Sequence, residues 1–517
     1  MKKVVVILAS ILLLLLAACG GSTTPSLTVS PTSVTVTAGD GPTSFNATLS
    51  GASGAISWSL SPNLGTLSSN SGPSVSYTPP ATVPTEQTVT LTASAAGLSA
   101  SATITVEPRK TDVMGVVIDP AGNPQSGKKV FIPGHQLQTS DADGKFSFSD
   151  VVVPYTVIVE DLSSRYYVYE GLTRSDPRVY VGGSWPSLPY SARVQGDVSP
   201  TTSGNELGIQ GAGDGCSFAT SLKITANHTS YDINTGMYKK TAELDIYALE
   251  WTKDTHNNAD SFVSWGKRSS VILADGGTFS NQDIVQPSAL TTHDLDVTLS
   301  PPSSLTPNQV IARVKLSPAG IPAFGNLTAS FTSSSISNNT VTVKSPDISS
   351  SVSGARMTIW GDFKDSDSIH SRAWNTVPVG NSSITVSIPE PPAISAPADG
   401  ATDVTTATNF AWSGPEGAIY EVDFNSSSFH VHLYTAATET HLPDLSAFNT
   451  SYPGNTSFNV RVLGIKFSGL YEGSVDQFVD PDRYPPFLAM FTSLLGAPLS
   501  DSGYYLFSKA ISFTTAN

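Results

Sequence analysis

The sequence predicts an all-β protein built from tandem β-sandwich domains, with one short helix in a C-terminal insertion. Short runs in which Val, Ile, Thr, Tyr and Phe alternate with polar residues recur along the chain, and a period of two is typical of strands. Ser, Thr, Gly and Pro crowd the segments between these runs and favour turns. The 517 residues exceed one sandwich, because domains usually hold about 100 to 150 residues, so we expect three to five units.

The first residues have the layout of a secretory signal. Two lysines precede an apolar run over residues 4–16, which ends in the sequence Leu-Ala-Ala-Cys at Cys19. The run suits the apolar core of a signal, about 7 to 15 residues, and is shorter than the roughly 20 that span a membrane. Leu-Ala-Ala-Cys resembles the lipobox of bacterial lipoproteins. The resemblance implies a signal peptide over 1–18, lipidation of Cys19 and a tether over 19–26, with an ordinary signal peptide as the alternative.

The charge and the cysteine count limit the possible partners. The formal net charge is -15, and loss of the two signal lysines makes it -17. This balance repels phosphate backbones, so we expect no nucleic-acid partner. The chain has two cysteines, and lipidation of Cys19 leaves Cys216 without a partner in the chain. We therefore expect no disulfide framework and a small buried or loop thiol at Cys216.

Two segments of the first half resemble known domain families. Residues 27–106 contain about seven short alternating strands with a central Trp58 and resemble a bacterial Ig-like domain, in which that tryptophan belongs to the core. Residues 112–190 contain the strand Val130-Phe131-Ile132 and an Asp-Ala-Asp-Gly turn before an aromatic strand, and they resemble the carboxypeptidase regulatory-like family. That resemblance implies a small transthyretin-like sandwich and confers no peptidase activity.

The middle region, residues 191–388, matches no family that we recognise and has room for one elaborate sandwich or two ordinary ones. Its densest acidic cluster is Asp362, Asp365 and Asp367, with His370 close by. Carboxylate oxygens are the ligands that calcium prefers, so these three residues are candidates for a metal site. A solvated acidic loop is the favoured interpretation of the cluster.

Residues 392–517 resemble a fibronectin type III domain, through the opening Pro397-Ala398-Asp399-Gly400 and the strand Phe410-Ala411-Trp412. About 35 residues, 464–502, separate its last two strands, and a connection of this length is often functional. The sequence from Pro485 to Gly496 has a proline start and a glycine stop, which bracket a short apolar helix. Such a helix covers either its own domain or a partner, and the candidates for binding are Tyr484, Phe487 and Phe491.

The common catalytic motifs are absent from the sequence. It contains no Gly-x-Ser-x-Gly elbow, no His-Glu-x-x-His helix and no phosphate-binding loop. His430 and His432 share one face of a predicted strand, and the alternation of Phe429, Val431 and Leu433 predicts that this face is the solvated one. We therefore expect no enzyme, no cofactor and no catalytic residues.

These observations predict a noncatalytic cell-envelope lipoprotein that displays β-sandwich modules for binding or adhesion. Its expected partners are the membrane, through the N-terminal lipid, and an envelope polysaccharide or protein. The expected location is extracytoplasmic, on the outer membrane or the cell surface. The alternative is an envelope hydrolase with its active site in residues 191–388.

Overall fold

The computed structural model describes residues 24–120, 122–182, 190–199, 201–214, 216–224, 229–237, 239–286, 288–316, 327–348, 352, 354–482 and 500–517. Most of these residues lie in strands, which confirms the all-β prediction. Their helical elements are two 3-10 helices, η1 (Ser446–Phe448) and η2 (Val475–Gln477). The predicted helix from Pro485 to Gly496 lies outside the described residues. None of the described helices is long and apolar enough to cross a membrane.

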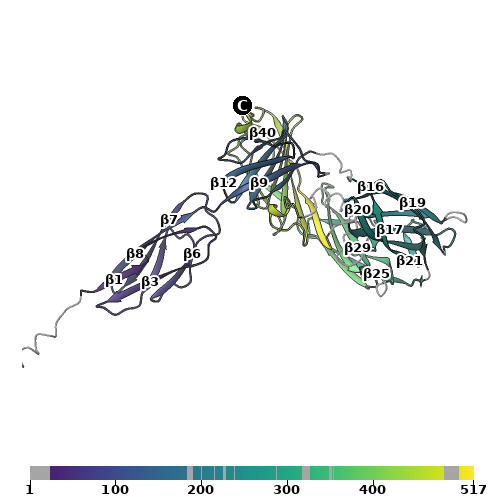
Figure 1. The fold of residues 1–517 in the computed structure, drawn as a ribbon, viewed down its shortest axis with the longest axis horizontal. Coiled ribbons are helices and arrows are strands. Elements are labelled where there is room, and N and C mark those ends of the chain that lie inside the picture. Colours follow the sequence, from purple (N-terminus) through teal and green to yellow (C-terminus); the bar gives the residue numbers. More distant parts are fainter. Residues whose placement is uncertain are drawn as a thin grey trace, which may run out of the picture. The chain divides into compact units, whose positions relative to one another are not determined.

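The chain divides into two compact units, and unit 1 comprises residues 1–112 and 150–154. Its described strands form two four-stranded sheets, with the orders β1-β3-β6-β5 and β2-β8-β7-β4 (Figure 1). Alternate side chains of each strand are buried between the sheets, and Trp58 lies in this core as predicted. The strands are β1 (Ser26–Ser30), β2 (Ser33–Thr37), β3 (Thr43–Ser50), β4 (Ser57–Ser61), β5 (Thr66–Leu67), β6 (Ser74–Thr78), β7 (Gln87–Ala95) and β8 (Leu98–Glu107).

Unit 2 comprises residues 113–149 and 155–517, and its largest element is one extended sheet. Among the described residues this sheet has the order β11-β10-β13-β14-β36-β35-β38-β39-β30-β29-β26-β27. In addition, β40 pairs with β38, and β33 pairs with β40. The strands are β10 (Lys129–Phe131), β11 (Gln138–Thr139), β13 (Tyr155–Leu162), β14 (Arg165–Leu172), β26 (Thr306–Lys315), β27 (Leu327–Ser333), β29 (Arg356–Lys364), β30 (His370–Pro378), β33 (Ala401–Val404), β35 (Ile419–Asn425), β36 (His430–Thr435), β38 (Ser457–Phe467), β39 (Ser502–Phe507) and β40 (Ile511–Thr515).

Smaller sheets pack on this large sheet and enclose separate cores. Sheet β32-β34-β37 covers one core with Phe410, Trp412 and Leu442, and sheet β28-β25-β31 covers another with Leu295 and Val343. The strands are β32 (Ala393–Ala396), β34 (Asn409–Ser413), β37 (Glu439–His441), β25 (Thr292–Ser300), β28 (Thr340–Pro346) and β31 (Ser383–Ser387). A third small sheet, β12-β9-β15, contains β9 (Lys110–Ile118), β12 (Lys145–Val152) and β15 (Arg178–Tyr180).

The first part of the middle region forms its own sheet. Its order among the described residues is β22-β16-β19-β18-β17-β20-β21-β24, and β23 pairs with β16. Alternate side chains enclose a core that includes Val194, Ile209 and Leu273. The strands are β16 (Tyr190–Ser199), β17 (Glu206–Asp214), β18 (Cys216–Lys223), β19 (Ser230–Met237), β20 (Thr241–Lys253), β21 (Ala259–Ala274), β22 (Thr278–Phe279), β23 (Ile284–Val285) and β24 (Ser288–Ala289).

The large sheet continues across residues that are far apart in the sequence. Strand β14 pairs in parallel with β36, which places Tyr167 opposite His432 and Tyr169 opposite Tyr434. The Tyr167 and His432 rings stack with centroids 5.0 Å apart, and the two tyrosine rings stack at 5.1 Å. We call this ladder the β14–β36 seam. It gives the predicted regions 112–190 and 392–517 one continuous sheet.

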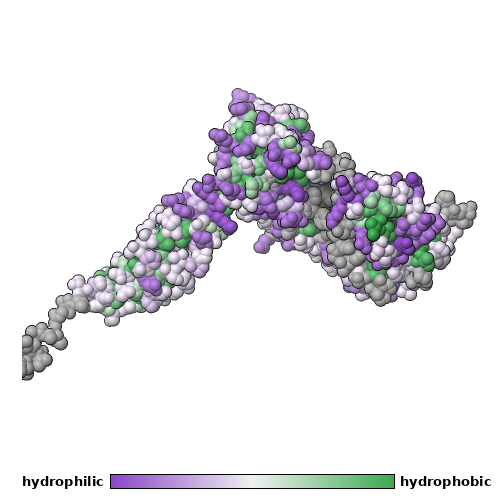
Figure 2. Space-filling view, in the orientation of Figure 1, coloured by the Kyte–Doolittle hydropathy of each residue, from purple (hydrophilic) through white to green (hydrophobic). Residues whose placement is uncertain are grey.

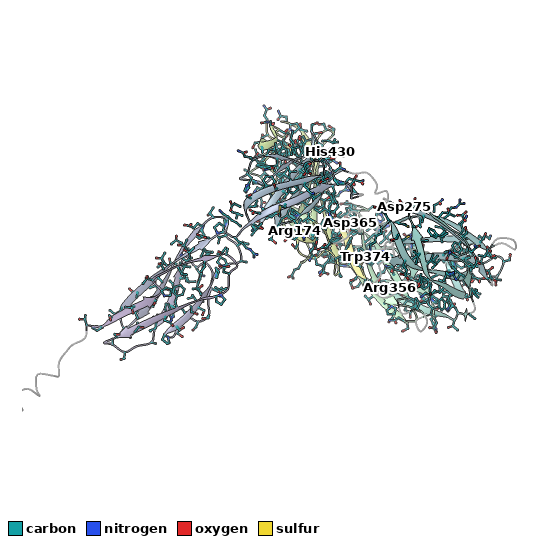
Figure 3. All side chains as sticks on the ribbon, viewed as in Figure 1. Arg174, Asp275, Arg356, Asp365, Trp374 and His430 are labelled. Atoms are coloured by element: carbon teal, nitrogen blue, oxygen red, sulfur yellow. The ribbon has the colours of Figure 1, made fainter. Side chains whose placement is uncertain are left out.

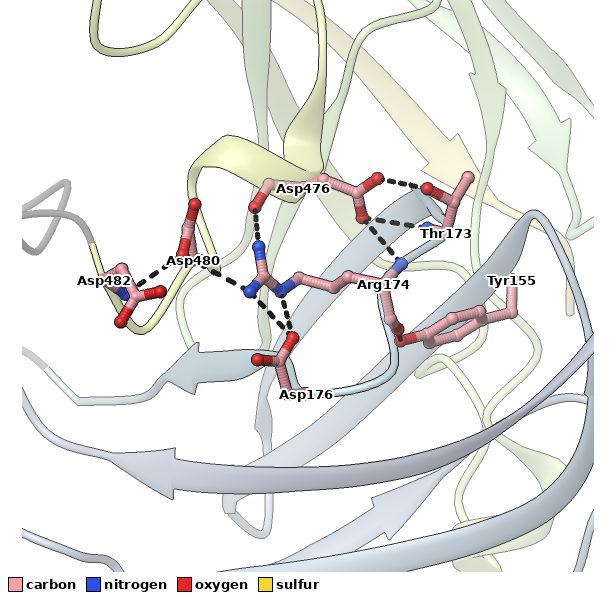
Figure 4. Close-up of polar contacts among 7 residues, drawn as sticks. All are labelled: Tyr155, Thr173, Arg174, Asp176, Asp476, Asp480 and Asp482. Carbon is pink, nitrogen blue, oxygen red and sulfur yellow. Dashed lines mark hydrogen bonds and ion pairs between the residues drawn. The ribbon is translucent and has the colours of Figure 1, made fainter.

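The long connection after β38 adds a second set of contacts between these regions. Asp476, at η2, accepts hydrogen bonds from the backbone N–H and the hydroxyl of Thr173, at 2.8 and 2.5 Å. Figure 4 shows the Arg174 guanidinium between Asp176 and Asp480, with its Nη2 2.7 and 3.3 Å from their carboxylates. Because Phe478 and Val479 are also buried, the described part of the connection packs against its own unit.

Candidate functional site

A hollow opens beside β37, the edge strand of the small sheet β32-β34-β37. The small sheet covers the core over β35, β36 and β38, while the seam extends the large sheet to β14, β13 and β10. The face of the large sheet therefore reaches beyond the edge of the small one. The hollow measures about 640 Å³ and lies over this extension.

Residues from four parts of unit 2 line the hollow. Ile158 and Leu442 belong to the core beneath it, and Phe131 packs edge-on against Phe448 with ring centroids 6.0 Å apart. These contacts give the hollow an apolar floor. The lining residues are Phe131, Pro133, Gly134, Thr156, Ile158, Glu170, Ala437, Glu439, Thr440, His441, Leu442, Pro443 and Asp444.

Glu170 is the most enclosed carboxylate of the hollow. It extends from β14 on the same face as Tyr166 and Val168, because alternate residues of a strand share a face. The Thr440 hydroxyl donates a hydrogen bond to Glu170 Oε1 at 2.9 Å, across 270 positions of sequence. Burial raises the pKa of Glu170, and hydrogen bonds from Thr440 and Thr435 partly offset that effect. The hollow thus contains a partly desolvated carboxyl group.

Two further carboxylates and one imidazole lie at the rim. Glu439, His441 and Asp444 are exposed, and all three line the hollow. Asn409 Nδ2 donates to Glu439 at 3.1 Å, and the Ser446 backbone N–H donates to Asp444 at 2.9 Å, where Asp444 precedes η1. The carboxylates outnumber the imidazole, so the rim and interior favour a cationic group over an anionic one.

The acidic cluster of the sequence, Asp362, Asp365 and Asp367, is bonded to other groups of this chain. Asp362 lies in β29 and is 4% exposed, which differs from the expected solvated loop. Asn308 and His370 lie 2.7 Å from Asp362 Oδ2, and Arg372 Nε lies 3.0 Å from Oδ1. Folding of β29 against β26 and β30 brings these partners together.

Asp365, labelled in Figure 3, lies with Asp367 in the turn between β29 and β30, whereas Asp362 lies within β29. Asp365 Oδ1 accepts the backbone N–H groups of Asp367 and Ile369 at 2.9 and 2.8 Å, and Asp367 pairs with Lys509 at 2.9 Å. Both residues line a second hollow, of about 330 Å³, with Glu390. Among the described residues, no three His, Cys, Asp or Glu side chains are grouped to hold a metal ion.

The structure corrects the expected environment of His432. We expect a solvated face from the alternation of β36, but Tyr167 of β14 stacks on the imidazole and leaves its side chain 25% exposed. Glu421 Oε1 and Asp423 Oδ1 lie 3.4 and 3.5 Å from His432 Nδ1. Burial lowers the His432 pKa, but Glu421 and Asp423 outweigh burial, so the net pKa is raised.

Among the described residues of 191–388, the most buried carboxylate is hydrogen-bonded to protein groups. Glu250, in β20, is 1% exposed and accepts hydrogen bonds from the Thr202 backbone N–H, Asn205 Nδ2 and the Ser264 hydroxyl at 2.8, 2.6 and 2.9 Å. These contacts use both of its oxygens. The hydrolase predicted for residues 191–388 stays a prediction.

Several predicted site residues lie outside the described residues, namely Cys19, Tyr484, Phe487 and Phe491. No sequence pattern singles out the hollow's residues Glu170, Glu439, Thr440 and Asp444. Glu170 lies in the tyrosine-rich strand β14 and Thr440 lies in the three-residue strand β37, so the two residues form no sequence motif with each other. Only the β14–β36 seam brings them together.

Comparisons with known proteins give distant structural likenesses only. No family model matches the chain, and no curated protein matches it. The Bacillus anthracis TIE protein is similar at 10% identity and a TM-score of 0.25, over 74% of this chain and 78% of that one. The pilus adhesin SpaC from Lactobacillus rhamnosus GG is similar at 9% identity and a TM-score of 0.15, over 76% and 57%. The major pilin subunit BcpA of Bacillus cereus is similar at 8% identity and a TM-score of 0.11, over 54% and 99%.

Proposed function

We propose that this chain is a noncatalytic envelope lipoprotein that binds a partner outside the cell through the hollow beside β37. The observation that supports the proposal is the hollow of about 640 Å³, which combines an apolar floor with a desolvated carboxyl group. Ligand sites are usually concave and mostly apolar, with a few placed polar groups. Figure 2 shows hydrophilic and hydrophobic residues interspersed over the face in view.

The sequence supports export and anchoring. The signal-like residues 1–18 and the lipobox-like end at Cys19 are consistent with a lipid anchor at the start of the mature chain, and a lipid with several acyl chains gives stable attachment. In this proposal the Ig-like module at 27–106 is a spacer. The carboxypeptidase regulatory-like and fibronectin type III-like modules display the hollow at the outer membrane or the cell surface.

A hollow-filling variant tests the proposal. Ala437 is exposed and lines the hollow, so Ala437→Trp places an indole where a ligand would bind. Cells displaying this variant should lose the surface attachment or partner binding that wild-type cells show. Ala52→Trp is the matched control, because Ala52 is exposed in unit 1. Equal attachment by wild type and Ala437→Trp would contradict the proposal.

The anchor has its own test. Replacing Cys19 with Ser should abolish incorporation of a labelled fatty acid and release the protein from membranes, because the lipobox thiol is the predicted acceptor. Replacing the second cysteine, Cys216, with Ser is the control and should leave labelling intact. Labelling that persists in Cys19→Ser would show that the chain carries an ordinary signal peptide.

A further inference from the structure

Among the described residues β37 is an edge strand, and it borders the hollow. Six consecutive residues, Glu439 to Asp444, line it, and the first three form β37, although successive side chains of a strand point to opposite faces. Both faces can contribute to one hollow only where the strand edge itself faces that space. β37 lies at the end of the described small sheet, where it pairs with β34. An edge strand presents unpaired backbone groups that another chain can pair with.

The charges of the hollow identify the partner's chemistry. Glu170 lies at the base, Glu439 and Asp444 lie at the rim, and the exposed His441 is the only basic side chain among the lining residues that the structure describes. The chain as a whole carries a net charge of -15. Attraction between a carboxylate and a cation strengthens where water is displaced. A lysine or arginine side chain therefore matches the hollow, and a phosphate or carboxylate does not.

The remaining lining residues favour a polypeptide over a polysaccharide. Sugars are commonly held on exposed faces of aromatic rings, and Phe131, the one Phe, Tyr or Trp among the described lining residues, is half-buried and packs edge-on against Phe448. A strand edge recognises polypeptide backbone through N–H and C=O groups at the spacing of another strand. Pro443 ends the edge, because proline has no N–H to donate.

From these observations we infer that an extended polypeptide segment carrying a lysine or arginine adds to the edge of β37 and places its cationic side chain beside Glu170. The inference rests on the proposed function, since it identifies the ligand of the same hollow. The partner's backbone pairs with residues 439–441, and its apolar atoms cover Ile158 and Leu442. Strand addition supplies affinity, and the carboxyl group at the base supplies the preference for a basic side chain.

The test uses the purified protein and a labelled peptide in which lysine alternates with threonine, with affinity measured by fluorescence anisotropy. Wild type should bind this peptide, and Glu170→Gln should weaken binding about tenfold or more, equal to about 1.4 kcal/mol or more. Asp260→Asn, which removes an exposed carboxylate of β21, should bind as wild type does. Unchanged binding by a folded Glu170→Gln would overturn the inference. If that variant does not fold, Glu439→Gln replaces it, and unchanged binding by Glu439→Gln would overturn the inference equally.

Two further probes separate strand addition from charge attraction. Methylation of alternate backbone nitrogens removes the hydrogen-bond donors from one edge of the peptide. One of the two possible methylated sets should lose binding and the other should keep it, whereas equal binding of both sets would overturn strand addition. A chitosan oligomer provides cations without a peptide backbone, and its binding in place of the peptide would overturn the inference in favour of a polysaccharide.

The outcomes also separate the inference from the proposed function. If Ala437→Trp abolishes surface attachment while no lysine peptide binds, the hollow is a binding site and the assigned partner is wrong. If Ala437→Trp has no effect on attachment, the proposed function itself fails.

Discussion

Asp476 accepts two hydrogen bonds from Thr173, which lies 303 positions earlier in the chain. The same carboxylate lies 3.3 Å from the backbone nitrogen of Arg174, and the Arg178 N–H donates to the Val479 carbonyl at 2.7 Å. The Asp476 side chain thus ties η2, within the long connection, to the end of β14 (Figure 4). This contact supports the same strand that carries Glu170.

Removal of the Asp476 carboxylate should open this contact. We expect Asp476→Ala to lower the local free energy of opening by about 1 to 3 kcal/mol, because backbone and hydroxyl donors lose an ionised acceptor. Hydrogen exchange of the amides of Thr173 and Arg174 measures the change directly. Asp482→Ala is the control, since Asp482 is exposed. Protected amides in Asp476→Ala would show that apolar packing alone holds the connection.

The His432 imidazole should make the β14–β36 seam pH-sensitive. Its folded pKa is raised by Glu421 and Asp423 against burial, while Arg165 opposes the rise. A raised histidine pKa means that the folded state binds the proton more tightly than the unfolded state. The stabilisation is therefore complete below the ordinary pKa of about 6.5 and is lost as pH rises through the higher folded value.

Unfolding measured across neutral pH tests this sign. In His432→Gln the decline of stability above neutral pH should become shallower than in wild type. His256→Gln is the control, because the His256 side chain is 81% exposed. Burial also raises the Asp423 pKa, which adds to the loss of stability with rising pH in a more acidic range. A stability that increases with pH through the neutral range would contradict the His432 assignment.

Asp362 should stabilise the β29–β30 hairpin without a metal. Its oxygens are taken by Asn308, His370 and Arg372, so Asp362→Ala removes the acceptor of all three. We expect a loss of about 1 to 3 kcal/mol, at the lower end because Arg372 and His370 are partly exposed. Asp294→Ala, which breaks an exposed pair with Lys344, is the control and should have little effect.

Thermal unfolding of the wild-type protein and of Asp365→Asn tests whether Asp362, Asp365 and Asp367 bind calcium. We expect the melting temperature of the wild-type protein to be equal in calcium and in a chelator, since protein donors and a lysine already occupy these carboxylates. A rise in melting temperature with calcium that disappears in Asp365→Asn would restore the metal site.

The Cys216 thiol should react slowly in the folded protein. Cys216 is 1% exposed, and burial raises its pKa, so the nucleophilic thiolate is scarce at neutral pH. A disulfide reagent such as dithionitrobenzoate should modify Cys216 only after addition of denaturant. Rapid modification of the native protein would indicate that β18 opens.

The strand content and the local cores follow from short-range patterns in the sequence. Alternation in residues 27–106 predicts the sandwich of unit 1 and the burial of Trp58, because each strand hides its apolar side chains on one face. The predicted strand Phe410-Ala411-Trp412 is part of β34. These features depend on residues close together in the chain, so their periodicity is visible without a structure.

Which strands pair depends on long-range packing. Parallel pairing of β14 with β36 depends on two strands that no local pattern links, and it covers His432 with Tyr167 where alternation predicts solvent. The same pairing brings Glu170 to Thr440 and extends the large sheet beyond β37. Strand order comes from the packing of whole sheets, so the hollow has no signature in the sequence.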